Sequence, residues 1–235
     1  MVSNMNKFIE QANISRNLRM DCYRLSLYPI LKYYNCDADL LIISNNLMLK
    51  KGKPLFAETT QFIDYNKLIS NMGIGQMVGV LKSKEMIINT LRKCIDQGGV
   101  AICFIDCYYY SPFRAVYNKS HVAHSIPVCG YDDENQVFYA IDYNYFENFS
   151  RTVVSVPYDD LSDSMLGYIE LKNLPNIQIM KIKYQNLDYQ DIRYKYINEF
   201  SEKLATILNN YHKNQLIPKT DTINYFKKIV LMKRR

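Results

Sequence analysis

Four strand-like stretches follow one another between positions 100 and 156, and they constrain the fold more than any other feature of the chain. Each is rich in β-branched and aromatic residues and is bounded by glycine, proline or a short polar run, as strands usually are. The stretches are VAICFIDCYY at 100–109, VAHSIPVCGY at 122–131, QVFYAIDY at 136–143 and RTVVSV at 151–156. Only the polar residues 132–135 separate the second from the third. These two are therefore expected to pair as an antiparallel hairpin.

A helical pattern precedes this region. The segment 22–34 (CYRLSLYPILKYY) has the apolar content and spacing of a largely buried helix. Asp21 stands where its side chain can accept a hydrogen bond from an otherwise unpaired N–H at the helix start. Pro29 lies inside the pattern, and it is expected to kink this helix or to shift its start.

The remaining elements complete an α+β pattern. Ser83 is expected to cap a helix that Gly98 and Gly99 end at about 97. The other expected elements are helices from 37 or 39 to 49, at 65–71, at 158–164, from about 188 and after 220, and a further strand at 165–174. Helices first, an antiparallel sheet second and helices last are typical of an α+β fold. We expect a catalytic domain at 1–180 and a helical C-terminal extension at 181–235.

The charge distribution argues against a nucleic-acid partner. The net charge is +6, but the lysines and arginines are scattered rather than gathered into a stripe. The exception is the C-terminal end, with Lys227, Lys228, Lys233, Arg234 and Arg235. This cluster is either a solvated helix end or a docking site for an acidic partner. No long apolar run is present, so we expect a cytoplasmic protein with no signal peptide and no membrane span.

The cysteines do not form a metal site in this reading. Six are present, at 22, 36, 94, 103, 107 and 129, without CxxC pairs or finger-like Cys/His spacing, so neither zinc nor another metal is expected. Cys94, Cys103 and Cys129 have apolar neighbours and are expected to be inert core residues. Cys22 differs, because it lies near a predicted helix N-terminus, where the helix dipole favours a thiolate.

A histidine and an aspartate complete a candidate catalytic set with Cys22. Histidine transfers protons readily near neutral pH, and the chain has three: His121, His124 and His212. His124 lies within an expected strand, whereas His121 is expected in a loop and His212 in an exposed tail. We therefore favour His124 as the base. Asp142 ends the apolar run VFYAID and is the candidate carboxylate.

The expected hairpin brings these last two side chains together. A turn centred between positions 133 and 134 places position 124 opposite about position 143, next to Asp142. A β-bulge, or a diagonal contact between neighbouring strand positions, closes the remaining gap. The carboxylate would then fix the tautomer of the His124 ring and stabilise its imidazolium form.

These motifs resemble those of a known group of enzymes. A cysteine on an N-terminal helix, followed by a histidine and an aspartate on adjacent strands, resembles the papain-like cysteine enzymes. The segments DCYRLSLYPILKYY at 21–34, IDCYYYSPF at 105–113, HVAHSIPVCGYD at 121–132 and FYAID at 138–142 are similar to the butirosin-biosynthesis acyltransferase N-terminal domain family. The resemblance covers about residues 15–175. Its last two segments are also shared with bacteriocin-processing peptidases.

The resemblance implies a carrier-dependent acyltransferase of natural-product biosynthesis. The acyl group would pass from an acyl or peptidyl carrier protein, which brings its own phosphopantetheine, to a small-molecule amine. No other cofactor is implied. By position, Cys22 is the nucleophile, His124 the base and Asp142 its orienter. Asp106 matches an aspartate before an aromatic pair and shapes either the acceptor pocket or the fold, with Tyr109 beside it.

Three questions stay open at this stage. Papain-type peptidases carry a glutamine shortly before the cysteine, whereas this chain reads SRNLRMDC, so Asn17 or the Cys22 backbone N–H is the candidate oxyanion donor. A cysteine peptidase or amidase would use the same three residues. A non-enzymatic binding module, in which Cys22 is merely structural, is the third interpretation.

Overall fold

The computed structural model describes the sheet and the helices that pack on it. The described residues are 21–34, 83–143, 151–174 and 179–181, together with single positions at 8, 36, 38, 41, 70, 81, 194, 198, 202 and 205. By its contacts the chain divides into two compact units, 1–42 with 66–189 and 43–65 with 190–235. Every helix and strand described below belongs to the first unit.

Most of the other expected helices fall outside the described residues. This applies to the helices expected at 37–49 and 65–71 and to the helical extension beyond position 181, whereas the boundary expected at 180 falls within the strand 179–181 of the first unit. Of the single positions described in these segments, 41, 70, 194, 198, 202 and 205 are helical. No helix in the described part of the chain is both long and apolar enough to span a bilayer.

The described strands form one antiparallel sheet, as the strand-like stretches predicted. Its order is β4-β3-β2-β1-β5, and every neighbouring pair is antiparallel. The strands are β1 (Ala101–Asp106), β2 (Ala123–Asp132), β3 (Val137–Tyr143), β4 (Arg151–Pro157) and β5 (Ile179–Lys181). A short 3-10 helix, η1 (Cys107–Tyr109), follows β1. The fold class is therefore α+β.

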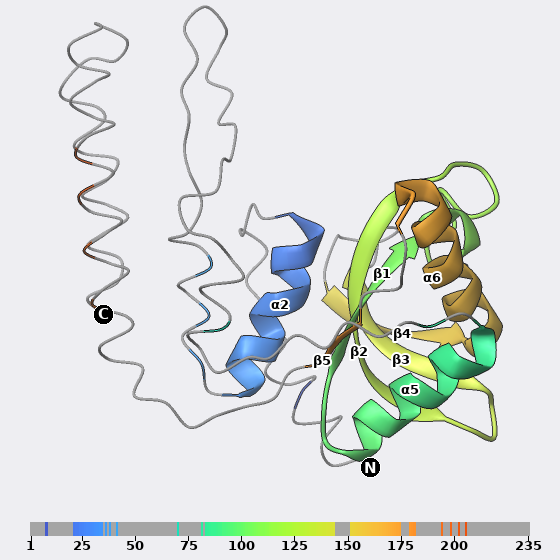
Figure 1. Ribbon diagram of the computed structural model, residues 1–235, viewed down its shortest axis with the longest axis horizontal. Coiled ribbons are helices and arrows are strands. Elements are labelled where there is room, and N and C mark those ends of the chain that lie inside the picture. The colour runs from blue at the N-terminus through green and yellow to red at the C-terminus, as the bar shows by residue number, and fades with distance from the viewer. Residues whose placement is uncertain are drawn as a thin grey trace, which may run out of the picture. The chain divides into compact units, whose positions relative to one another are not determined.

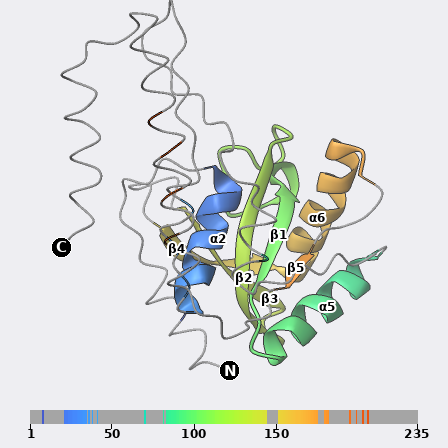
Figure 2. The same cartoon turned by 60° about the vertical axis from the view of Figure 1, so that its left-hand side comes forward.

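Helices cover both faces of this sheet. Figures 1 and 2 show α2 (Cys22–Tyr33) on one side of the strands, and α5 (Lys84–Asp96) and α6 (Tyr158–Lys172) on the other. On the side of α5 and α6, fully buried Ile87, Leu91 and Met165 pack against strand residues such as Ile105 and Ile126. This apolar core supplies the hydrophobic free energy that holds the two helices on the sheet.

Helix α2 forms as its sequence predicted, and Pro29 does not end it. Asp21 Oδ1 accepts a hydrogen bond from the backbone N–H of Arg24 at 2.9 Å, which caps the helix start. Leu27, Ile30 and Leu31 are completely buried around the proline. Their burial offsets the loss of one backbone hydrogen bond, so the helix continues to Tyr33.

Two expectations for the segment after β4 were wrong. Residues 165–174 were expected to be a strand after a short helix, but α6 continues through Lys172 and ends at Asn173 with φ +49°. The reason is tertiary burial, because Leu161 and Met165, one helical turn apart, are both fully buried against the sheet. The outer strand is instead β5, which pairs with β1 over residues 101–103.

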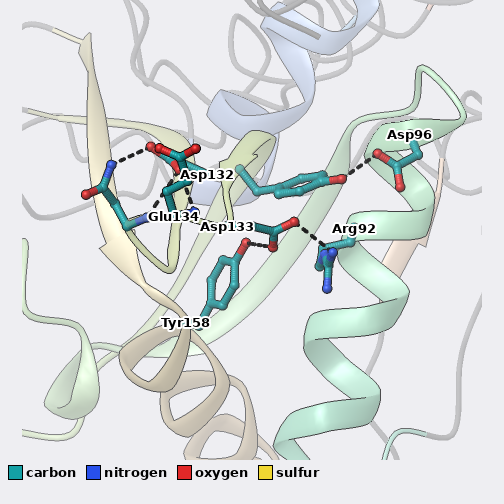
Figure 3. Close-up of polar contacts among 8 residues, drawn as sticks. Arg92, Asp96, Asp132, Asp133, Glu134 and Tyr158 are labelled. Carbon is teal, nitrogen blue, oxygen red and sulfur yellow. Dashed lines mark hydrogen bonds and ion pairs between the residues drawn. The ribbon is translucent and has the colours of Figure 1, made fainter.

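A polar network fixes the turn of the β2–β3 hairpin. Figure 3 shows Asp133 between Arg92 of α5, at 2.7 Å, and Tyr158 of α6, at 2.9 Å. Tyr131 donates to Asp96 of α5 at 2.7 Å, and Asp132 accepts the backbone N–H groups of residues 134 and 135. The hairpin is therefore tied at this end to both helices that cover its face.

Two leucines on α6 test its extent and its buried face. Leu161→Ala removes a fully buried side chain and is expected to lower the free energy of unfolding by about 2–5 kcal/mol. Leu171→Ala, at a position 38 % exposed, is the matched control and should change it by less than about 0.5 kcal/mol. Urea unfolding followed by circular dichroism measures both. Equal losses would contradict the helix described here.

Candidate active site

Cys22 is the first residue of α2, directly after the Asp21 cap. It is half-buried, while the other five cysteines of the chain are buried. Interactions with His124 and Ser125, which are neighbours on β2, lower the pKa of its thiol. The structure therefore brings the cysteine from near the start of the chain to a histidine about a hundred residues later.

The second contact of the set joins β2 to β3. His124 Nε2 lies 3.0 Å from Asp142 Oδ1, and only 12 % and 4 % of the two side chains are exposed. Because the carboxylate occupies Nε2, the other ring nitrogen, Nδ1, is the one that can exchange a proton with Cys22. The three residues thus form a continuous row from sulfur to imidazole to carboxylate.

A one-residue bulge puts His124 and Asp142 on the same face of the sheet. The β2–β3 register runs Asp132↔Val137 to Gly130↔Tyr139 and then shifts to Val128↔Ala140, so that Cys129 is extra. Continued along the strands, the shifted register places Asp142 opposite position 126, two residues from His124, and residues two apart share a face. Without Cys129, Asp142 would oppose position 127, and its side chain would point to the other face.

The contact is therefore diagonal rather than directly opposite. The turn is centred between Glu134 and Asn135, one residue later than the sequence pattern suggested. This displacement shifts the pairing of β2 with β3 by two positions, and the bulge at Cys129 restores only one of them. Diagonal side chains on one face lie about 7–8 Å apart at their backbones. An imidazole and a carboxylate can bridge that separation.

The electrostatics of the row favour a thiolate paired with an imidazolium. Burial raises the pKa of the Cys22 thiol, but the hydrogen bonds to His124 and Ser125 and the charge of His124 outweigh burial, so the pKa lies below its ordinary value. Burial lowers the pKa of His124, but Asp142 and Cys22 together raise it to about 9. The ion pair is thus populated between the lowered thiol pKa and about pH 9.

Asp21, which caps α2, disfavours the Cys22 thiolate, and the charge of Arg24 reduces this effect. The charge of Asp21 raises the pKa of the Cys22 thiol, although its side chain is needed to cap the helix. Arg24, whose side chain is almost fully buried, places Nε 3.2 Å from Asp21 Oδ2. Its positive charge compensates that of the cap, so the sulfur lies next to a nearly neutral pair rather than a bare carboxylate.

A second His–Asp pair lies close by, and sequence reasoning missed it. Asp106 is 1 % exposed, and its Oδ2 lies 2.6 Å from Nδ1 of His121. Its Oδ1 accepts the backbone N–H groups of Tyr108 and Val122. Asp106 thus organises η1 and the segment before β2, which is the structural role considered for it. The signal in the sequence was His121, which its loop position led us to set aside.

The other expected site residues have mixed placements. Tyr109 lies on η1 with its ring over Gly167 of α6, where an added Cβ would come 2.5 Å from the ring. Burial raises the pKa of its hydroxyl. Asn17, the candidate oxyanion donor, lies outside the described residues. No group of three or more potential metal ligands occurs among the residues that the structure describes.

Further residues around the sulfur were not predicted. Ser26, one turn along α2, donates to the Ser125 carbonyl at 2.8 Å and so fastens the helix to β2. The rings of Tyr23, Phe104 and Tyr168 stack in a row, with centroids 5.6 Å apart in each pair. Tyr23 follows Cys22 directly, and the charge of Cys22 helps to raise the pKa of Tyr168. The Tyr168 hydroxyl therefore lies close enough to the thiol to feel its charge.

Comparison with protein-family models and with curated proteins gave no match to this chain. The chemistry proposed below therefore rests on the geometry of the site and on the sequence motifs.

The lowered pKa of Cys22 can be tested by alkylation. The rate of iodoacetamide labelling at Cys22, followed by peptide mapping, should reach half its plateau below the pH of an ordinary thiol, because only the thiolate reacts. His124→Ala removes the imidazolium and should raise this midpoint. Cys107, whose pKa burial raises to about 12, is the internal control. An unchanged midpoint in the variant would contradict the ion pair.

The raised pKa of His124 can be tested by NMR. With ¹³C-labelled histidine, the His124 resonance should titrate near pH 9. Asp142→Asn keeps a hydrogen-bond acceptor but removes the charge, so the midpoint should fall toward about 6.5. Asp159→Asn, at a largely exposed position of α6, is the matched control and should leave it in place. Titration of the wild-type ring near 6.5 would show that Asp142 does not stabilise the imidazolium.

Proposed function

We propose that the chain is a papain-like cysteine acyltransferase, with Cys22 as nucleophile, His124 as acid and base, and Asp142 as the residue that orients His124. The observation that supports this most directly is the row in which His124 lowers the pKa of the Cys22 thiol and His124 Nε2 lies 3.0 Å from Oδ1 of buried Asp142. A half-exposed thiol of lowered pKa beside an imidazole is the arrangement that nucleophilic catalysis requires.

The first step would form an acyl-enzyme. The Cys22 thiolate attacks the carbonyl carbon of a carrier-bound thioester, and a new C–S bond forms. The bond to the pantetheine sulfur then breaks, and the His124 imidazolium donates its proton to the departing thiolate. The thioester on the carrier is exchanged for one on Cys22 at little free-energy cost, and His124 is left neutral.

The second step would form an amide. A neutral amine attacks the acyl-enzyme, and the neutral His124 ring accepts one proton from the attacking nitrogen. The C–S bond to Cys22 breaks and regenerates the thiolate and imidazolium pair. Asp142 stabilises the imidazolium in both steps, because its carboxylate stays hydrogen-bonded to Nε2.

The start of α2 is the proposed source of oxyanion stabilisation. The first backbone N–H groups of a helix have no partner further along it and carry the positive end of its dipole. Cys22 is the first residue of α2, so its own N–H lies close to the carbonyl that the sulfur attacks. A donor at this place typically contributes about 10²–10³ in rate.

Two features favour transfer over hydrolysis. The stacked rings of Tyr23, Phe104 and Tyr168 are proposed to shield an acyl-enzyme from water. The basic residues near the C-terminal end of the sequence would suit an acidic carrier protein. The proposed partners are accordingly a carrier protein and a small amine, as in the acyltransferase family that the motifs resemble. A cysteine peptidase or amidase with the same triad is the second candidate.

Acyl loading would distinguish these functions. The protein is incubated with carrier proteins bearing different acyl-phosphopantetheine thioesters, and its intact mass is measured. A gain equal to the acyl group, absent in Cys22→Ala, is expected, and an added amine should discharge it as an amide. Cys107→Ala, the matched control at a buried thiol, should still load. Cleavage of peptides without loading from any carrier would favour the peptidase instead.

A further inference from the structure

His121 and Asp106 have the geometry of an acid–base pair that the triad leaves unused. The carboxylate of Asp106 is 1 % exposed and accepts three donors: Nδ1 of His121 at 2.6 Å and the backbone N–H groups of Tyr108 and Val122. An aspartate held in this way keeps the His121 proton on Nδ1. The other nitrogen, Nε2, is then a lone-pair acceptor.

The His121 ring is fixed in orientation but open to solvent. Its face stacks on Tyr108 with the ring centroids 4.4 Å apart and 12° between the planes, and Tyr109 meets it edge-on at 6.3 Å. Even so, 54 % of the His121 side chain is exposed. Within the described part of the chain, Nε2 has no hydrogen-bond partner.

This pair lies beside the triad rather than on a remote surface. His121 precedes His124 by three residues, a separation of at most about 10 Å along extended chain. Asp106 pairs across the sheet with Ala123, next to His124. The buried thiol of Cys107 links the two pairs, because the charges of Asp142, Asp106 and Cys22 all act on it. Both pairs therefore lie near the same end of β1, with Asp106 and His124 at adjacent positions of the β1–β2 register, whose side chains alternate between the faces of the sheet.

Amide formation from an ammonium acceptor involves the loss of two protons, of which the triad histidine accepts one. An alkylamine reaches the enzyme as an ammonium ion, and at pH 7 only about one molecule in a few thousand is neutral when its pKa is near that of lysine. An ammonium must lose two protons to become an amide nitrogen. His124 accepts one of them during the attack, so the other must leave before the nitrogen can act as a nucleophile.

We propose that His121, held by Asp106, is a second catalytic base that accepts the first proton from an alkylammonium acceptor as it approaches acylated Cys22. The inference rests on the proposed acyl transfer and assigns the acceptor class as primary amines protonated at neutral pH. Nε2 of His121 takes the proton and releases it to solvent through the exposed edge of the ring. The neutral amine then attacks, and His124 accepts the second proton.

The test uses a preloaded acyl-enzyme, so neither natural substrate is needed. Full-length protein is acetylated at Cys22 with p-nitrophenyl acetate, and the loss of the acetyl group is followed by intact-protein mass spectrometry at pH 7. Ethanolamine is the ammonium acceptor, and hydroxylamine is an acceptor that is already neutral at this pH. His121→Gln should slow discharge to ethanolamine by about 10²-fold and leave discharge to hydroxylamine nearly unchanged.

Two further variants make the result specific. Asp106→Asn should reproduce the selective loss, because an amide that donates to Nδ1 moves the ring proton to Nε2 and removes the acceptor. Ser120→Ala, at the exposed neighbouring position, is the matched control and should discharge to both amines like the wild type. Acetylation of Cys22 at the wild-type rate shows that each variant keeps a folded triad.

The remaining outcomes would contradict either the role of His121 alone or both that role and the acyltransferase proposal. Equal loss toward both amines in His121→Gln, or no loss, would show that His121 is not an ammonium base while leaving the acyltransferase proposal standing. A wild-type acetyl-enzyme that water discharges as fast as either amine would overturn both proposals. So would failure of Cys22 to become acetylated.

Discussion

The contact between His124 and Asp142 depends on one extra residue in β2. A strand alternates its side chains between two faces, so the identity of the face is decided by counting residues from the turn. Cys129 adds one to that count, and the imidazole and the carboxylate then share a face at 3.0 Å. The polar network around Asp133 holds the turn, and therefore the register from which the count begins.

The cysteine meets this pair through the start of a helix rather than through a strand. Helix α2 places Cys22 at its N-terminus, and Ser26 fastens the helix to the carbonyl of Ser125. The same first turn contains conflicting charges, because the capping carboxylate of Asp21 disfavours the thiolate that the helix end favours. The guanidinium of Arg24 at 3.2 Å reduces that conflict. Helix capping and thiolate stabilisation are thereby compatible in one turn.

Two histidines three residues apart have different surroundings, and their roles follow from these differences. His124 is almost buried, and its pKa is raised to about 9 by Asp142 and Cys22, which suits an ion pair with a thiolate. His121 is half-exposed, with a buried aspartate behind it and a tyrosine against its face, which suits exchange of protons with solvent. An acyl transfer to an ammonium acceptor would use both properties in sequence.

Local sequence pattern determined the helix at 22–33 with its Asp21 cap, the helix capped by Ser83, and the antiparallel strands between 101 and 157. It also determined the choice of Cys22, His124 and Asp142 as candidate site residues. Pattern was sufficient for the helices and strands because periodicity and capping act within a few residues. Pro127 and Gly130, irregular residues in a strand pattern, were the available signal for the bulge. Only tertiary structure decided the rest. Burial against the sheet made 165–172 helical, pairing to β1 created β5, and the buried carboxylate of Asp106 fixed His121, because each depends on partners distant along the chain.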